Sequence, residues 1–488
     1  MSISFSLARA ERREELSAFY QNVIAVMRRH GLHEWEWGVY PNEDLLKRDI
    51  EEQSLYLMEE DGKLLAAFTI SARQEEEYAR VPWIFGVKPA TLHRLAMAPE
   101  SYGLGMAQRV MVFVKVQAQR LGFDSLRMDS SGENERMLKL FRSAMRRTAG
   151  VVTFDDPARP FFCFESPLSD ACPMLPIRMH PAYRYGEMTP WGGDQLGKVF
   201  GKRIPDPRTG ESMEVSAIRG LESRDDMKEP VPELCLRFGE QLLGQDAHGP
   251  FPLLLKLIAA RDTLSVQVHP DDAYAAEHEH KLGKSEAWVI LHADEGAGIL
   301  YGIREGVARA DFERAVAAGE PLDPLIRRVE VHTGDVFYMP SGMVHAIGAG
   351  IVLYEIQQSS DVTYRLWDYN RTNAKGEKRP LHLKQALDVM DPALKGETVH
   401  MPEEAGAARL LTVPAFTLDS LCVSGKQVLP AHPQGFRTFT ALAGLLLSWP
   451  GDALELKAGE SALLPATCPE LTITGVGKAL IAAVNHDA

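Results

Sequence analysis

The chain has 488 residues, 45% of them hydrophobic and 25% charged, which is long enough for two or three globular domains. Its formal net charge of -14 at pH 7 excludes the basic surface that a nucleic-acid-binding protein needs. The five cysteines form no CxxC pair, the apolar runs are too short to span a bilayer, and charged residues follow the N-terminus too closely for a signal peptide. We therefore expect a cytoplasmic protein with reduced thiols, no membrane or nucleic-acid partner, and a small-molecule ligand.

Helical periodicity and strands alternate up to about residue 168. The pattern predicts, in chain order, a helix at 9–30, a hairpin of strands 55–58 and 64–70 joined through Asp61-Gly62, a strand at 93–97, a helix at 106–121, a strand at 125–128 and a helix at 133–145. This alternation predicts an α+β domain over residues 1–168.

A glycine-containing turn at 103–107 separates the strand at 93–97 from the next helix. Such a turn at a helix N-terminus presents free backbone N–H groups and the positive end of the helix dipole, which suits a pyrophosphate. The succession of strand, Gly-x-Gly turn, long helix, strand and a second helix resembles the GNAT acyltransferase fold over residues 3–166. The resemblance implies that acetyl-CoA is held by Gly103, Leu104, Gly105, Met106, Ala107 and Asn134.

Two positions depart from that family. Glu100 stands three residues before the first glycine, where Gln or Arg is usual, and Leu140-Phe141 occupies the place of a frequent tyrosine general acid. Two hypotheses follow: an active acetyltransferase, or a degenerate domain that binds an effector or assists assembly.

Residues 169–176 belong to a proline- and serine-rich stretch that predicts a linker. Beyond it, short β-branched strands separated by Gly, Pro and Asp turns dominate, with helices expected only at 310–318 and 383–390. We predict mainly-β cupin or jelly-roll domains with short helices, one over 177–395 and a second over 396–488.

The richest chemistry lies in the segment from Leu264 to Asp272. Gln267 and His269 stand two residues apart in a predicted strand, so both side chains point to the same face. Glu286 and His345 follow later in the chain, the latter at the end of a Gly-x5-Pro-x-Gly-x2-His motif that begins at Gly334 and resembles the second cupin motif. Together these four residues offer N and O ligands for a divalent metal.

Several blocks resemble type I phosphomannose isomerase, in its short bacterial form. They include 251–258 running into 264–272, Gly283–Trp288, Pro340–Ile347 and Ser360–Tyr369, all in the expected order over residues 174–488. The resemblance implies an enzyme that interconverts mannose 6-phosphate and fructose 6-phosphate, with Zn²⁺ held by Gln267, His269, Glu286 and His345. It also implies that Arg365 is the essential arginine, that Lys284 and Asp361 line the pocket, and that Ser265 helps to hold the phosphate.

Aldose–ketose exchange moves a proton between adjacent carbons through an enediol(ate), which a Lewis acid and a guanidinium stabilise. We expect Lys284 to share a strand face with Glu286, and Asp361 to share one with Arg365. Lys284, Asp361 and a metal-bound water all remain candidates for the proton carrier. The long family members carry a phosphate-binding lysine after the arginine, whereas here Asp368, Asn370 and Arg371 follow. Two interpretations of Arg371 stay open: it substitutes for that lysine, or, as we favour, it is a solvated surface residue.

Two further hypotheses stay open. The protein could be bifunctional and also transfer an acetyl group, or it could be a non-catalytic cupin that senses a sugar. Oligomeric state is not predicted.

Overall fold

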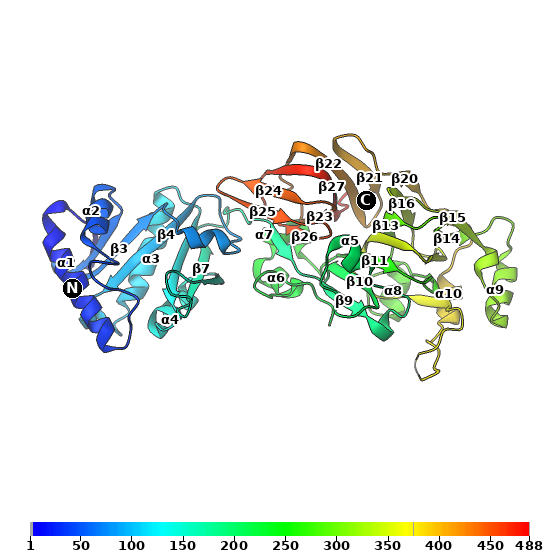
Figure 1. Ribbon diagram of the computed structural model, residues 1–488, viewed down its shortest axis with the longest axis horizontal. Helices are drawn as coiled ribbons and strands as arrows, with labels where there is room; N and C mark the ends of the chain where they lie inside the picture. The colour runs from blue at the N-terminus through cyan, green and yellow to red at the C-terminus, as the bar shows by residue number, and fades with distance from the viewer. Residues whose placement is uncertain (1–2, 374, 488) are drawn as a thin grey trace. The chain divides into compact units, whose positions relative to one another are not determined.

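The computed structural model describes residues 3–373 and 375–487, and the chain divides into two compact units (Figure 1). Unit 1 comprises residues 1–175 with 449–452, and unit 2 comprises 176–448 with 453–488. The regions predicted as separate domains, 177–395 and 396–488, therefore fall mostly within one unit. No helix among the described residues is long and apolar enough to cross a membrane.

Unit 1 is built on a seven-stranded sheet in the order β1-β2-β3-β4-β5-β7-β6. Its strands are β1 (Ile3–Leu7), β2 (Leu55–Glu60), β3 (Lys63–Ser71), β4 (Pro89–Met97), β5 (Ser125–Ser131), β6 (Arg147–Val152) and β7 (Phe161–Pro167). Its helices are α1 (Arg13–Arg29), α2 (Glu43–Glu51), α3 (Met106–Arg120) and α4 (Glu135–Ala144), with short 3-10 turns η1 (Ala10–Arg12), η2 (Glu76–Arg80) and η3 (Pro99–Ser101). Neighbouring strands are antiparallel except for β4 and β5, which are parallel.

Two apolar cores hold the helices of unit 1 to this sheet. Leu16 and Tyr20 of α1 and Leu46 of α2 pack with buried residues of β2, β3 and β4. The apolar sides of α3 and α4 join a second core, which contains Phe68 and Phe164 from the sheet. The predicted helices and strands of this half are confirmed, but α2, the strands β1, β6 and β7 and the three 3-10 turns were not predicted.

Unit 2 contains three antiparallel sheets. The seven-stranded sheet runs β20 (Thr398–His400), β16 (Asp335–Met339), β13 (Glu286–Ala293), β18 (Ile351–Gln358), β11 (Leu253–Ala260), β10 (Thr209–Val215), β9 (Ala182–Tyr185). The five-stranded sheet runs β15 (Ile326–Glu330), β14 (Gly298–Ile303), β17 (His345–Ile347), β12 (Val266–Val268), β19 (Tyr364–Trp367). A core that includes Trp288, Ile299, Phe337 and Ile347 joins residues of both sheets.

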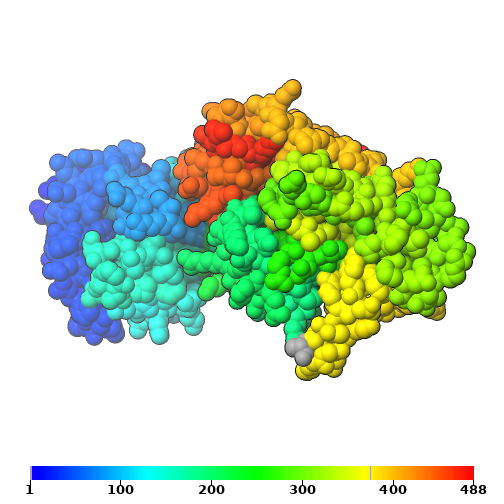
Figure 2. Space-filling model, turned by 45° about the vertical axis from the view of Figure 1, so that its right-hand side comes forward, coloured from blue at the N-terminus to red at the C-terminus, as the bar shows by residue number. Residues whose placement is uncertain are grey.

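The third sheet collects the C-terminal strands. It contains β21 (Gly406–Thr412), β22 (Phe416–Leu429), β27 (Leu471–Val484), β23 (Arg437–Ala441), β26 (Ser461–Leu464) and β8 (Ile177–Met179), with β24 (Leu445–Trp449) and β25 (Asp452–Leu456) beside them. Because β8 pairs with β26, the first strand after the predicted linker belongs to the C-terminal sheet. Figure 2 shows the orange and red C-terminal residues lying against the green middle of unit 2.

The helices of unit 2 are short. They are α5 (Gln195–Phe200), α6 (Val231–Phe238), α7 (Glu240–Leu243), α8 (Asp272–His278), α9 (Arg309–Ala318) and α10 (Leu383–Val389), with 3-10 turns η4 (Gly186–Met188), η5 (Gln245–Ala247) and η6 (Asp323–Leu325). The fold is thus multidomain and mostly β with short helices, as predicted, and the helices expected at 310–318 and 383–390 are confirmed.

Candidate metal centre

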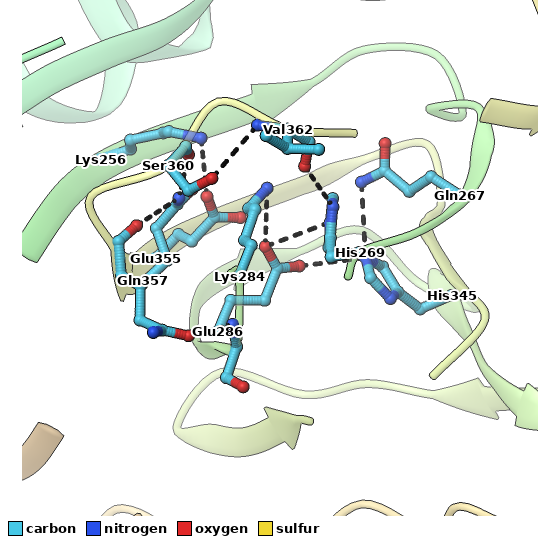
Figure 3. Close-up of polar contacts among 12 residues, drawn as sticks. Lys256, Gln267, His269, Lys284, Glu286, His345, Glu355, Gln357, Ser360 and Val362 are labelled. Carbon is cyan, nitrogen blue, oxygen red and sulfur yellow. Dashed lines mark hydrogen bonds and ion pairs between the residues drawn. The ribbon is translucent and has the colours of Figure 1, made fainter. Parts of the chain in front are cut away.

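Four predicted ligands converge in unit 2, from both of its central sheets. Gln267 of β12 and His345 of β17 are direct partners in the antiparallel register of the smaller sheet. Glu286 begins β13 in the larger sheet, and His269 follows β12 at the turn before α8, whose first turn is capped by Asp271. In Figure 3 the carboxylate of Glu286 points at the rings of His269 and His345.

Short distances join the side chains of His269, Glu286 and His345. Nε2 of His345 lies 3.0 Å from Oε1 of Glu286, and Nε2 of His269 lies 3.6 Å from Oε2 of the same carboxylate. One ligand atom from each of the three residues lies within 4.8 Å of the others, and all three side chains are buried. Among residues 3–373 and 375–487, the Nε2 atom of His269 has no hydrogen-bond partner.

Backbone carbonyls orient both imidazole rings. Nδ1 of His269 lies 2.9 Å from the carbonyl oxygen of Val362, and Nδ1 of His345 lies 2.9 Å from that of Met343. A carbonyl can only accept, so each Nδ1 carries the proton and donates it, which leaves each Nε2 with a free lone pair. Both lone pairs are then directed at the carboxylate of Glu286, so the three side chains together present donor atoms suited to a cation.

The electrostatics favour the protonation states that a metal requires. Burial, assisted by the charge of Lys284, lowers the pKa of His269 well below its usual range, so this ring is neutral. Burial alone would raise the pKa of Glu286, but the neighbouring groups, the Lys284 ammonium first among them, outweigh it and lower that pKa. A neutral imidazole and an ionised carboxylate are the ligand forms of these residues.

Gln267 completes the set through its amide. Its Nε2 lies 3.4 Å from Nε2 of His345, so the amide end reaches the same point. The oxygen and nitrogen of an amide are assigned by their hydrogen bonds, and turning the group by half a rotation presents Oε1 instead. Two imidazole nitrogens, one carboxylate and one amide oxygen fit a borderline divalent metal such as Zn²⁺.

Lys284 lies beside the cluster, whereas the Asp361 carboxylate pairs with another residue. Nζ of Lys284 is 2.9 Å from Oε2 of Glu286, although the residue precedes strand β13 instead of lying in it. Asp361 is in the loop before β19, so the expected shared strand face with Arg365 is wrong. Its carboxylate pairs at 2.5 Å with Lys281, which outweighs the effect of burial and lowers the pKa of Asp361.

Ser265 and Arg365 are in contact, as their predicted common role requires. Nε of Arg365 donates to Oγ of Ser265 at 3.3 Å, and β19, which carries Arg365, pairs with β12. Nη1 of Arg365 donates to the carbonyl of Pro380 at 3.0 Å, which links the arginine to the segment before α10.

Arg371 and Arg379 flank a single carboxylate near Arg365. Both pair with Asp368 at 2.5 Å, and Nη1 of Arg371 also donates to the carbonyl of Thr263 at 2.6 Å. Burial first, and then the charges of Arg379 and Arg371, lower the pKa of Arg365, so three guanidinium groups act on one another here. From the sequence, Arg371 was placed on the surface and Arg379 was not identified. Arg379 lies close to Asp368 only because the chain turns back toward β19.

A buried ionic row lies behind the cluster on adjoining strands. Nζ of Lys256 lies 2.8 Å from Oε1 of Glu355 and 3.6 Å from Oε1 of Glu211, and Nε1 of Trp288 donates to Oε2 of Glu355 at 2.9 Å. The Trp288 ring meets the His345 ring edge-on at 5.4 Å between centroids. This row was not predicted from the sequence, because its members are far apart along the chain.

The predicted acetyl-CoA turn of unit 1 has the expected backbone. Gly103 and Gly105 have φ values of +79° and +74°, in the left-handed region that favours glycine, and α3 starts at Met106 immediately afterwards. Leu104 is exposed, and Ala107 is the second residue of α3. Asn134 caps α4 by accepting from the Met137 N–H at 3.2 Å.

Glu100, the departure before that turn, is part of an ion pair. Its carboxylate lies 2.8 Å from Nζ of Lys63, which lowers the pKa of Glu100. Its negative charge is therefore at least partly compensated within unit 1.

Comparison with known proteins identifies the family to which unit 2 is similar. The model of the phosphomannose isomerase type I catalytic domain matches residues 190–295. The mannose-6-phosphate isomerase of Streptococcus mutans is 39% identical over 292 residues, which cover 57% of this chain and 89% of the relative. The mannose-6-phosphate isomerase ManA of Bacillus subtilis is 36% identical over 301 residues and is covered to 94%.

Solved structures agree in fold. The crystal structure of a mannose 6-phosphate isomerase from Bacillus subtilis superposes with a TM-score of 0.56 at 29% identity, over 63% of this chain and 99% of that one. A mannose 6-phosphate isomerase bound with zinc and yttrium shares the fold at a TM-score of 0.51 and 14% identity, over 64% of this chain and 99% of that one. The fold and the site define an aldose–ketose isomerase with a buried cluster that can hold a metal. The chain belongs to the type I phosphomannose isomerase family.

Proposed function

We propose that unit 2 interconverts mannose 6-phosphate and fructose 6-phosphate with a Zn²⁺ ion held by Gln267, His269, Glu286 and His345. The observation that carries this proposal is the convergence of three ligand atoms within 4.8 Å in a buried site. When bound, the ion would act as a Lewis acid toward the sugar oxygens and lower the cost of an enediolate. All remaining steps fall to side chains of this chain.

We assign the phosphate group to the arginine cluster. Arg365, Arg371 and Arg379 carry three positive charges against the single carboxylate of Asp368, which leaves an excess of two. A phosphate dianion compensates that excess, and the planar guanidinium presents paired donors to it. Asp368 would hold two of the arginines in place, while Ser265 holds Arg365.

We assign the proton transfer between the two carbons to Lys284. It lies against Glu286 at the cluster, whereas Asp361 is engaged by Lys281. As a neutral amine, Lys284 would accept the proton from one carbon, and the resulting ammonium would return it to the neighbouring carbon. Lys284→Met should therefore abolish exchange of the substrate C2 hydrogen with solvent deuterium while the protein still retains zinc.

Metal content tests the ligand assignment. Mass spectrometry of the purified full-length protein should find one zinc per chain, and His269→Ala should lose it. His332→Ala is the matched control, because the His332 side chain is 74% exposed and belongs to the same unit. Equal zinc content in both variants would contradict the assignment.

We also propose that residues 177–395 form the metal-binding cupin domain and residues 396–488 a second β domain packed on it. The support is the sheet pattern: apart from β20, the strands of the two sheets that carry the ligands lie within 177–395, and apart from β8, the strands of the C-terminal sheet lie within 396–488. The five cysteines are all free, which suits our proposal of a cytoplasmic location.

For unit 1 we propose a GNAT-like fold that binds acetyl-CoA at Gly103–Ala107 and Asn134. The support is the single parallel pair, β4 with β5, whose connection is a glycine turn followed by the long helix α3. The first N–H groups of α3 have no side-chain cap and would face the pyrophosphate. Calorimetric titration with acetyl-CoA tests this: Gly105→Val should weaken binding, and Gly122→Val, at another left-handed glycine of unit 1, should not.

A further inference from the structure

Arg365, which we assign to the phosphate, lies at the edge of a sheet. Its strand, β19, is the last of the five-stranded sheet and pairs with β12 on its inner side. The main-chain N–H and C=O groups on the outer side of an edge strand need partners from elsewhere in the chain. For Arg365, one residue, His382, supplies both partners.

His382 contacts Arg365 through its main chain and through its side chain. Its N–H donates to the carbonyl oxygen of Arg365 at 2.9 Å, and its Nδ1 accepts from the N–H of Arg365 at 3.2 Å. The carbonyl of His382 accepts from the N–H of Ala386 at 2.9 Å, which connects the same residue to the first turn of α10. The imidazole therefore takes the place that a neighbouring strand would have.

This contact determines the protonation state of the ring. A main-chain N–H can only donate, so Nδ1 of His382 carries a lone pair and the hydrogen of the neutral ring is on Nε2. A protonated ring carries hydrogen on both nitrogens and cannot accept from Arg365. His382 therefore holds the main chain of Arg365 only while the ring is neutral.

The surroundings of the ring favour the neutral form near pH 7. The charged and titratable groups around it are Arg365 and Tyr364 of β19 and Glu279, which follows α8. Burial first, and then the charge of Arg365, lower the pKa of His382, whereas Glu279 has the opposite effect. Glu279 accepts a hydrogen bond of 2.8 Å from the Tyr364 hydroxyl.

Polar contacts hold the segment 379–382 in place. Pro380 and Leu381 are exposed, so apolar packing contributes little to its position. The carbonyl of Pro380 nevertheless accepts from Nη1 of Arg365 at 3.0 Å, and Arg379 pairs with Asp368. The segment thus contacts both the guanidinium and the main chain of Arg365, and His382 is the residue that joins it to β19.

We propose that His382 is a positioning residue of the isomerase: it fixes the main chain of Arg365, and with it the guanidinium, where the phosphate of the substrate binds. This inference rests on the proposed function, because it requires Arg365 to bind that phosphate. His382 acts through Arg365 and not on the reacting carbons. Its loss should therefore weaken substrate binding more than it slows the chemical step.

Steady-state kinetics of the full-length, zinc-loaded protein with mannose 6-phosphate test the proposal with two variants. His382→Asn places an amide oxygen where Nδ1 lies and can still accept from Arg365, whereas His382→Leu cannot. His382→Leu should raise KM about fivefold or more with a smaller change in kcat, and His382→Asn should keep KM within about twofold of the wild type. His332→Leu is the matched control, because the His332 side chain is 74% exposed.

The pH dependence of KM separates positioning from a loss of stability. Below about pH 6.5 the wild-type ring begins to take up a proton and to release the N–H of Arg365, so KM should rise. The phosphate of the substrate titrates near pH 6 as well, but it does so equally for every variant. The ratio of the wild-type KM to the His382→Asn KM should therefore increase as pH falls from about 7 to about 5. A ratio that stays constant over this range would contradict the proposal.

Binding of glucitol 6-phosphate, which has no carbonyl group and cannot isomerise, tests the same contact without turnover. Calorimetric titration should show affinity about fivefold or more weaker in His382→Leu than in the wild type. Turnover by the wild type, together with unchanged KM and unchanged glucitol 6-phosphate affinity in His382→Leu, would overturn this inference and leave the proposed function standing. Equal losses in His382→Asn and His382→Leu would also overturn it. No turnover by the zinc-loaded wild type would overturn the proposed function itself.

Discussion

The ionic row behind the metal cluster gives a quantitative test of the architecture through Lys256→Met. Lys256, Glu355 and Glu211 have side chains that are 6%, 3% and 8% exposed, so neither carboxylate can recover water when the lysine is removed. Burial alone would lower the pKa of Lys256, but Glu355 and Glu211 outweigh it and raise that pKa, so the lysine is charged. Its loss leaves a net buried negative charge.

The size of the destabilisation depends on the partners that Glu211 and Glu355 retain once the lysine is removed. Glu211 keeps Arg184 at 3.3 Å, whereas Glu355 keeps only the neutral indole N–H of Trp288. Removing one partner of a buried ion pair costs about 3–5 kcal/mol. Unit 2 spans residues 176–448 and 453–488, for which the unfolding entropy is roughly 0.6 kcal/mol/K, so the fall in melting temperature is on the order of 5–8 °C.

Scanning calorimetry of the full-length protein measures this fall. Lys198→Met is the matched control, because Lys198 and Asp194 form an exposed pair in the same unit and such pairs contribute about 0–1 kcal/mol. Adding Glu355→Gln to Lys256→Met removes the orphaned charge and should recover part of the loss. A Lys256→Met protein that melts with the Lys198→Met control would refute the reasoning.

Three further predictions follow from the two units. Glu286→Gln should weaken zinc binding by more than about 100-fold in a chelator competition, since even outer partners of metal ligands contribute about 10–100-fold. Arg379→Met should raise KM for mannose 6-phosphate by about tenfold or more with a smaller change in kcat, because it removes phosphate binding and not chemistry; a fall in kcat alone would argue against this role. His93→Gln should make unit 1 more resistant to acid: the unfolded chain protonates His93 below about pH 6.5 and the folded chain only below about 4, so stability is lost as pH falls through this window, by roughly 3 kcal/mol at pH 4. Melting curves from pH 7 to 4 that coincide for His93→Gln and the wild type would contradict it.

The metal ligands could be predicted because the sequence features that indicate them are local. The period of two in a strand brings Gln267 and His269 together, and the turn around Gly342 delivers His345 to the start of β17. The close approach of Lys284 to Glu286 depends in the same way on a separation of two residues.

The remainder depends on pairing over long distances. Lys256 meets Glu355 only because β11 and β18 pair with these two residues opposite each other, and a single sequence does not specify that register. Asp361 was placed on the same strand face as Arg365 because the two are four residues apart, but Asp361 precedes β19 in a loop, where it pairs with Lys281. Arg379 reaches Asp368 because the chain reverses direction between these two residues.

The most direct test of the central claim is turnover of mannose 6-phosphate to fructose 6-phosphate by the purified full-length protein, before and after a chelator and then with zinc restored. We expect activity that the chelator removes and that zinc restores in the wild type but not in His345→Ala. Full activity in protein shown to be free of metal, or no turnover by folded protein that contains one zinc per chain, would contradict it.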